Sequence, residues 1–209
     1  MTTVDVGVLF RNNRDLVDPF FFFLKAASSG VQTRVIAIDQ ESSDGTLDAI
    51  RRHTDPIAGL HRGIASGRNN ILRRRSPGRH LLLVDSDVFF ARHDAIAKMV
   101  DAIESNVRVG VAYCPVSSFY TGKVETGFCC AMLSSAAIGA VGQFDERFQM
   151  FYDDSDYFNR MTKLGFCASI PLECLAVHVW GSTTHTGSEG FRKQECLASD
   201  GAEYEKKWK

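Results

Sequence analysis

Apolar, strand-like runs alternate with helix-like runs along the first half of this chain. The runs VDVGVLF (Val4 to Phe10), TRVIAID (Thr33 to Asp39) and HLLLVD (His80 to Asp85) have the length and the composition of buried strands. After the third run, apolar residues from Ile96 to Ile103 are spaced as on one face of a helix. Because this order favours strands joined by crossover helices, it predicts an α/β fold with a mostly parallel central sheet.

Turn and capping residues predict where the helices of the first half begin. Asp18 followed by Pro19 is typical of an N-cap and the first helical residue, and the block Phe20 to Phe23 behind it is expected in the core. Gly63 to Gly67 indicates a loop, and Arg68 to Arg75 indicates the helix after it.

The second half is less regular. Strands are expected at Val109 to Cys114, Phe128 to Leu133 and Leu172 to Trp180, and a helix is expected over Asp153 to Gly165, with acids in its first turn. The stretch Gly181 to Gly190 is rich in Gly, Ser and Thr and is expected to be a mobile loop. The charged end, EYEKKWK, indicates either a tail or the point at which a longer protein continues.

Length, charge and cysteine usage exclude several classes of protein. The 209 residues suit one large α/β domain or two fused half-domains, and a net charge of −1 argues against a nucleic-acid partner. Charges interrupt the N-terminal segment too early for a secretory signal, and the longest apolar block, PFFFFL, is too short to span a bilayer. The six cysteines form no C-x-x-C pair, so neither zinc nor a disulfide framework is expected. The sequence therefore predicts a soluble, cytoplasmic protein with no transmembrane segment.

Two carboxylates follow directly behind an apolar strand. Asp85 and Asp87 flank Ser86, and residues i and i+2 of an extended segment point the same way. Ligands of open α/β sheets collect at the carboxyl ends of strands. Two such carboxylates repel each other unless a cation or a proton lies between them, and Mg²⁺ or Mn²⁺ would relieve the repulsion. The pattern indicates either a divalent-cation site or an acidic turn that caps the next helix.

Further motifs occur in a fixed order. The first half has VIAIDQESSDGT, ASGRNN and LLLVDSD; the second has VGQFDERFQMFYDDSDYFNRMTKLGF and then a strand with a late histidine, LAVHVWG. This set, over about residues 4 to 182, resembles the GT-A glycosyltransferases of the family 2 type. The resemblance implies a single GT-A domain over residues 1–209, in which a Rossmann-like nucleotide-sugar-binding half (1–92) is fused to an acceptor-binding and catalytic half (93–209).

The resemblance also implies roles for individual residues. Asp87 and His178 match the metal ligands, with Asp85 beside the ribose or the metal, and Asp154 matches the catalytic base. Contacts with the nucleotide are expected from Phe10, Asp39, Arg68 and Ser86. The alternatives that stay open are a turn cap for Asp39, a surface arginine for Arg68, a core histidine for His178 and plain helix-start acids around Asp154.

The implied reaction moves a single sugar from a nucleotide-diphosphate sugar to a hydroxyl of a glycan or glycoconjugate acceptor, with Mn²⁺ or Mg²⁺ as cofactor. A UDP-linked donor of the glucose or rhamnose type is expected, with inversion at the anomeric carbon. The loop Ser117 to Gly127 is expected to help bind the acceptor.

Two departures from the family pattern affect these expectations. FRNN (Phe10 to Asn13) stands where the family often has PTYN, which changes the residues that meet the base, and DD stands where it has ED. No Q-x-x-R-W motif is present, which disfavours a processive synthase. The alternatives are a retaining transferase on the same fold, a nucleotide-sugar or glycan binding module without turnover, and a nucleotidyltransferase. The lack of a Gly-rich, Lys-containing phosphate loop argues against the last.

Overall fold

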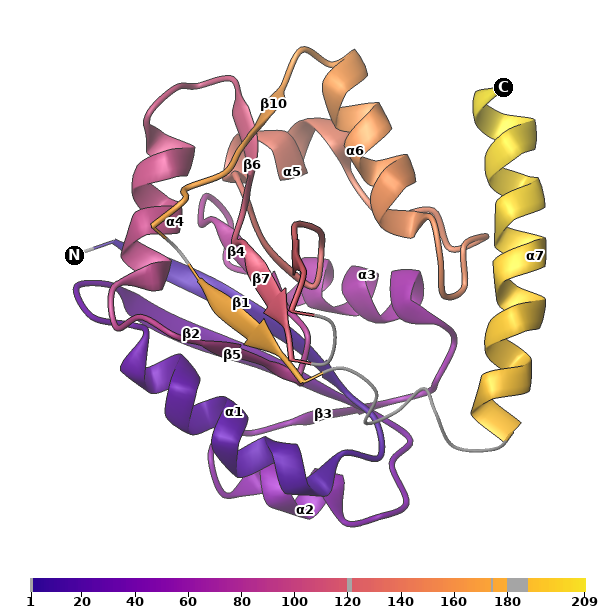
Figure 1. Ribbon diagram of the computed structural model, residues 1–209, viewed down its shortest axis with the longest axis horizontal. Helices are drawn as coiled ribbons and strands as arrows, with labels where there is room; N and C mark the ends of the chain where they lie inside the picture. The colour runs from indigo at the N-terminus through magenta and orange to yellow at the C-terminus, as the bar shows by residue number, and fades with distance from the viewer. Residues whose placement is uncertain (1, 120–121, 174, 180–187) are drawn as a thin grey trace.

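The computed structural model describes residues 2–119, 122–173, 175–179 and 188–209. It has a central sheet with helices on both faces, and a long C-terminal helix stands along one side (Figure 1). Among the described residues, no helix combines the length and the apolar character that crossing a bilayer requires.

The central sheet has seven strands in the order β10-β6-β9-β4-β1-β2-β3. Their bounds are β1 Thr3–Phe10, β2 Gln32–Gln40, β3 Ile57–Gly59, β4 Leu81–Val84, β6 Val109–Tyr113, β9 Cys130–Leu133 and β10 Cys167–Ser169. The neighbours from β4 to β3 are parallel, as are β10 and β6, whereas β9 runs antiparallel between β4 and β6. The sheet is mixed and mostly parallel, which confirms the predicted fold class.

A second, smaller sheet has four strands in the order β5-β11-β7-β8. Their bounds are β5 Val88–Phe90, β7 Val116–Ser118, β8 Val124–Glu125 and β11 Ala176–His178. Since β5 directly follows the turn after β4, this sheet joins the carboxyl edge of the central sheet to the late part of the chain. The observed strand β11 is shorter than the strand predicted over Leu172 to Trp180, and Trp180 lies outside the described residues.

The helices form two layers. Their bounds are α1 Arg14–Ala26, α2 Thr46–Arg51, α3 Ile64–Arg74, α4 Ala95–Glu104, α5 Ser135–Val141, α6 Asp153–Lys163 and α7 Ser188–Trp208. Buried residues of α1, α2 and α4 belong to one apolar cluster and those of α3, α5 and α6 to a second, on the other face of the sheet. Gly7 in β1 lets α3 approach closely, because a Cβ there would lie 2.3 Å from Cγ2 of Ile71.

The first helix begins earlier than the sequence predicts. It starts at Arg14, and Pro19 lies inside it. Two side chains at or just before the start of α2 accept hydrogen bonds from the N–H groups that begin α1: Asp44 Oδ2 accepts from Arg14 N–H, and Thr46 Oγ1 accepts from Asn13 N–H. Tertiary contacts therefore replace the local Asp18–Pro19 cap.

Two other expectations in this half are wrong. Phe22 and Phe23 are 68% and 38% exposed, so only part of the phenylalanine block is core. The helix expected from Arg68 begins at Ile64, and Gly67 lies within it, where a side chain would meet Leu9 of β1. Gly63 and Gly67, which indicated a loop, instead allow close packing, because a side chain at either position would collide with Gln149 or Leu9.

The C-terminal segment, for which the sequence indicated either a tail or the point at which a longer protein continues, is helical. The helix α7 extends from Ser188 to Trp208, and Cys196 and Asp200 on its inner face are buried. The expected mobile loop falls mostly on residues 180–187, which lie outside the described residues, and its last three residues belong to α7.

Candidate active site

Asp85 and Asp87 lie on a tight turn at the carboxyl end of β4. The carbonyl of Asp85 accepts a hydrogen bond from Val88 N–H at 3.1 Å, and the N–H of Asp85 donates to the carbonyl of Cys129 at 2.9 Å. The two carboxylates converge, as predicted, but the cause is this turn rather than the alternation of an extended strand.

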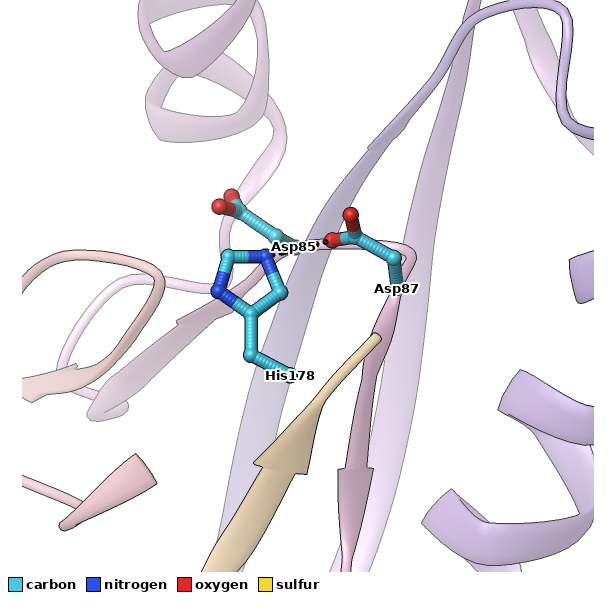
Figure 2. Close-up of side chains that lie close together, drawn as sticks. All are labelled: Asp85, Asp87 and His178. Carbon is cyan, nitrogen blue, oxygen red and sulfur yellow. Dashed lines mark hydrogen bonds and ion pairs between the residues drawn. The ribbon is translucent and has the colours of Figure 1, made fainter. Parts of the chain in front are cut away.

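Strand β11 brings His178 to the two acids. His178 pairs with Val88 in the antiparallel ladder of β11 and β5, and Val179 N–H donates to the carbonyl of Asp87 at 2.9 Å. The Nε2 atom of His178 lies 3.1 Å from Oδ1 of Asp87. Figure 2 shows the two carboxylates and the imidazole close together at the ends of their strands. His178 is therefore part of the site and not a satisfied core histidine.

These three side chains fit a divalent cation. One ligand atom from each of Asp85, Asp87 and His178 lies within 4.8 Å of the others. Oxygen ligands lie about 2.1 Å from Mg²⁺, so ligands on opposite sides of an ion are about 4.2 Å apart, and a small side-chain movement closes the set. Carboxylates with one imidazole suit Mn²⁺ or Mg²⁺. The structure thus has a candidate metal centre, as the sequence predicts.

The electrostatics of this centre favour added positive charge. Burial and the nearby charge of Asp87 raise the pKa of Asp85 to about 7, although Arg68 and His178 act in the opposite direction. Burial lowers the pKa of His178, but its hydrogen bond with Asp87 and the charges of Asp87 and Asp85 raise it further, so the net shift is upward. In both residues, the part of the pKa shift that comes from neighbouring carboxylates indicates negative charge that a cation would neutralise.

Asp39 and Asn13 lie at the same edge of the sheet and each keeps an oxygen without a protein partner. Asp39 is the second-last residue of β2, where it pairs with Phe10 at the end of β1, and its Oδ2 accepts from Ser42 N–H at 3.2 Å. Asn13 donates through Nδ2 to the hydroxyl of Ser86. Oδ1 of Asp39 and Oδ1 of Asn13 are buried and have no hydrogen-bond partner within the described part of the chain. Buried acceptors are normally satisfied, so both indicate a ligand with N–H or O–H donors.

The sequence prediction did not include Asn13. Its signal is its place in the chain, three residues after the end of β1 and next in space to Ser86 of the D-S-D turn. The prediction singled out Phe10 instead. Phe10 has no exposed surface, and its ring packs against Phe20 and Phe21, so the side chain offers no surface to a base in this structure.

Arg68 is buried between the metal centre and α6. Its Nη1 donates to Oδ2 of Asp153 at 2.6 Å, and its guanidinium stands 5.5 Å from the ring centre of Phe128. Burial lowers the pKa of Arg68, but the charges of Asp153, Asp85 and Asp154 raise it further, giving a net upward shift. Arg68 is therefore not a surface arginine, and its contact with a nucleotide stays a prediction.

Two of the three acids at the start of α6 are neutralised by the protein itself. Asp153 forms the ion pair with Arg68, and burial, partly offset by this pair, raises the pKa of Asp153. Asp156 has no exposed surface; its Oδ2 accepts from Arg160 Nε at 2.9 Å, and its Oδ1 lies 2.5 Å from Nζ of Lys207 on α7. Both acids are therefore structural.

Asp154 differs from its neighbours. Its Oδ1 accepts from the N–H and the hydroxyl of Ser155, and it has no ion pair with any described residue. It lines a pocket of about 210 Å³ whose other walls come from the end of β6, the segment before β9 and α6: Tyr113, Thr126, Gly127, Phe128, Ser155 and Phe158. Burial is the main cause of the raised pKa of Tyr113, and the nearby carboxylate of Asp154 is the second. A charged carboxylate thus faces a small pocket with aromatic walls.

Solved structures with this fold are glycosyltransferases of the GT-A type. The mannosyltransferase PcManGT from Pyrobaculum calidifontis, in complex with GDP-Man and Mn²⁺, is 19% identical with a TM-score of 0.68, and the match covers 97% of this chain and 64% of that one. Mannosyl-3-phosphoglycerate synthase from Rubrobacter xylanophilus is 11% identical with a TM-score of 0.69, covering 99% and 74%. GalNAc-T7 with UDP, GalNAc and Mn²⁺ is 10% identical with a TM-score of 0.68, covering 86% and 44%.

The sequence itself places the chain in one family. The model of glycosyl transferase family 2 matches residues 5–168, so the chain belongs to that family. No curated protein sequence matches it significantly. The matched region includes every residue of the candidate site except His178, which β11 supplies afterwards.

Proposed function

We propose that this chain transfers a single sugar from a nucleotide-diphosphate sugar to a hydroxyl of a glycan or glycoconjugate acceptor, with inversion at the anomeric carbon. The observation that carries the proposal is the different treatment of the acids. Asp85 and Asp87 converge with His178 on a cation-sized space, whereas Asp154 is free of ion pairs among the described residues and faces a pocket.

The donor side is assigned to the carboxyl edge of the central sheet, in the half 1–92. Asp85, Asp87 and His178 would hold a divalent cation, which would supply Lewis acidity for the leaving diphosphate. Asp39 and Asn13 present their unsatisfied oxygens to N–H or O–H donors of the nucleoside, and Ser86 holds Asn13 in place. An imide N–H of uracil matches the Asp39 carboxylate, which supports a UDP-linked donor. Glucose or rhamnose is the sugar that we propose for it.

The acceptor side is assigned to the half 93–209, around the pocket at Asp154. The aromatic rings of Tyr113 and Phe158 suit the apolar face of a sugar ring, whereas Asp154 and Ser155 suit its hydroxyl groups. In the transfer, the acceptor oxygen forms a bond to the anomeric carbon while the carboxylate of Asp154 takes the proton of the acceptor hydroxyl. The bond between the anomeric carbon and the diphosphate breaks on the opposite face.

The test of this role is Asp154→Asn. Loss of the base is expected to lower kcat by about 10²- to 10⁴-fold and to leave the affinity for nucleotide and Mn²⁺ unchanged. Asp101→Asn, an exposed acid on α4, is the matched control and is expected to keep full activity. Unchanged turnover in Asp154→Asn would contradict the assignment of Asp154 as the base. If the wild-type protein binds nucleotide and Mn²⁺ but transfers no sugar, a binding module is favoured instead.

The donor and the stereochemistry need a second measurement. A screen with UDP-glucose, nucleotide-linked rhamnose and GDP-mannose is expected to give transfer with the UDP-sugar or the rhamnose donor, in the presence of Mn²⁺ or Mg²⁺. GDP-mannose is included because one structural neighbour holds GDP-Man. The anomeric configuration of the product, read by NMR, decides between inversion and the retaining alternative.

A further inference from the structure

We infer that α7 positions the catalytic helix α6, and that Asp200 is the positioning residue through which it acts. The inference rests on the proposed function, since it concerns the placement of Asp154. It adds a residue that lies outside the region matched by the family.

The carboxylate of Asp200 fills a nest of backbone N–H groups. Its Oδ2 accepts hydrogen bonds from three consecutive residues: Gln149 at 3.1 Å, Met150 at 2.9 Å and Phe151 at 2.9 Å. Successive N–H groups that converge on one point form an anion-binding concavity. Asp200 is only 1% exposed, so this bound anion belongs to the protein itself.

The nest leads directly into the first turn of α6. Tyr152 follows it as the N-cap residue, with a left-handed φ of 62°, and its carbonyl accepts from Asp156 N–H at 2.8 Å. The ring of Tyr152 stacks on Tyr204 of α7, with centroids 5.0 Å apart. Both the backbone before Asp154 and the left-handed residue that precedes its helix are thus held by α7. Figure 1 shows the loop before α6 running beside α7.

The opposite side of the same loop is fixed to α3. The carbonyl of Gln149 accepts from Ile64 N–H at 2.6 Å, and a Cβ on Gly63 would lie 2.6 Å from that carbonyl oxygen. Helix α3 also carries Arg68, the partner of Asp153. The loop is therefore clamped between α3 and α7, and a displacement of the loop would reach Asp154 three residues later.

Further contacts extend along α6. Trp208 Nε1 donates to Asp156 at 2.9 Å, and Asn159 Nδ2 donates to the hydroxyl of Tyr204 at 2.7 Å. These contacts keep α7 docked when the nest is disturbed. Loss of the Asp200 carboxylate should therefore release the loop and leave the fold in place.

The experiment compares Asp200→Ala and Asp200→Asn with the wild type. Since a shift of about 1 Å in a catalytic group can cost about 100-fold in rate, Asp200→Ala is expected to lower kcat by about 100-fold. Asp200→Asn keeps one acceptor oxygen without the charge and is expected to lose about tenfold. The KM for the donor and the calorimetric stoichiometry of nucleotide with Mn²⁺ are expected to stay within about twofold.

Glu205→Gln is the matched control on α7, because the Glu205 carboxylate pairs with Lys209 at the exposed end of the helix. It is expected to leave kcat unchanged. A normal kcat in Asp200→Ala, or a loss of kcat accompanied by an equal loss of binding stoichiometry, would overturn the positioning role. Should Asp200→Ala fail to fold, the same readouts on Asp200→Asn decide.

Amide hydrogen exchange separates this inference from the proposed function. In Asp200→Asn the amides of residues 149–151 and the first turn of α6 are expected to exchange faster, whereas those of the central sheet stay protected. If the wild type transfers no sugar, the proposed function fails, and unchanged exchange at residues 149–151 would then reject the positioning role separately.

Discussion

The turn D-S-D at residues 85–87 and the helix start D-D-S-D at residues 153–156 look alike in sequence but differ in structure. In the first, neither acid has a Lys or Arg ion pair among the described residues, and His178 is the nearest partner. In the second, Asp153 pairs with Arg68, and Asp156 pairs with Arg160 and Lys207. Of these three acids, only Asp154 has no ion pair with a described residue.

The difference teaches that clusters of acids are sorted by the cations within their reach. A cluster that the protein neutralises itself is a structural element, whereas one left negative at a sheet edge awaits a ligand cation. Arg68 lies between the two clusters: it pairs with Asp153 of the second and is close enough to Asp85 of the first for the charge of Asp85 to raise its pKa.

The largest expected effect is on stability, in Arg68→Ala. The side chain is 8% exposed and its partner Asp153 is 3% exposed, so the change leaves a buried carboxylate without its cation. Removing one partner of a buried ion pair costs about 3–5 kcal/mol, which thermal or urea unfolding would measure. Arg73→Ala, at an exposed position of the same helix, is the control and should cost little.

A double variant sharpens this prediction. Arg68→Met with Asp153→Leu replaces both charges by apolar groups, and most of the lost stability is expected to return. If the double variant stays as unstable as Arg68→Ala, the ion pair is not what makes Arg68 stabilising, and the contrast between the two acidic clusters weakens.

A smaller effect, on metal binding, is expected in His178→Ala. Loss of one of three protein ligands should weaken Mn²⁺ binding by about 100-fold, because metal affinity depends on the complete ligand set and its support. His53→Ala, a histidine on the segment after α2 that pairs with Asp18, is the control. Calorimetry with Mn²⁺ measures both, and equal affinities in the two variants would remove His178 from the metal centre.

The metal side of the site was largely predictable from the sequence. Asp39 lies near the end of the apolar strand β2, and Asp85 follows the apolar strand β4. The carboxyl ends of parallel strands meet at one edge of a sheet, so local pattern and general topology suffice. The strand that carries His178 was predicted too, over Leu172 to Trp180, although it is only three residues long, and the family resemblance supplied the role of its histidine.

The environment of α6 was not predictable in the same way. The pair of Asp156 with Arg160 is local, at i and i+4 on α6. The other partners of Asp153 and Asp156 come from α3 and α7, 85 and 52 residues away for Arg68 and Trp208, and nothing local marks those contacts. The sequence did not predict helix α7, because its inner face carries the polar residues Asp200, Tyr204 and Lys207. These residues are typical of a solvated surface, but the loop and α6 pack against them. Periodicity finds apolar faces, but this one is polar and is satisfied by tertiary hydrogen bonds.

The smallest expected effect distinguishes two contacts of α7: the hydrogen bond of Trp208 with Asp156, and the hydrogen bonds of Asp200 with the loop before α6. Trp208→Phe removes the hydrogen bond from Nε1 to Asp156, but Asp156 keeps Arg160 and Lys207, so no buried charge is left alone. The expected cost is about 1 kcal/mol in unfolding free energy, with kcat nearly unchanged. Chemical denaturation and steady-state kinetics on the same samples test this. A large fall in kcat would mean that the end of α7, and not the Asp200 nest, sets the position of Asp154.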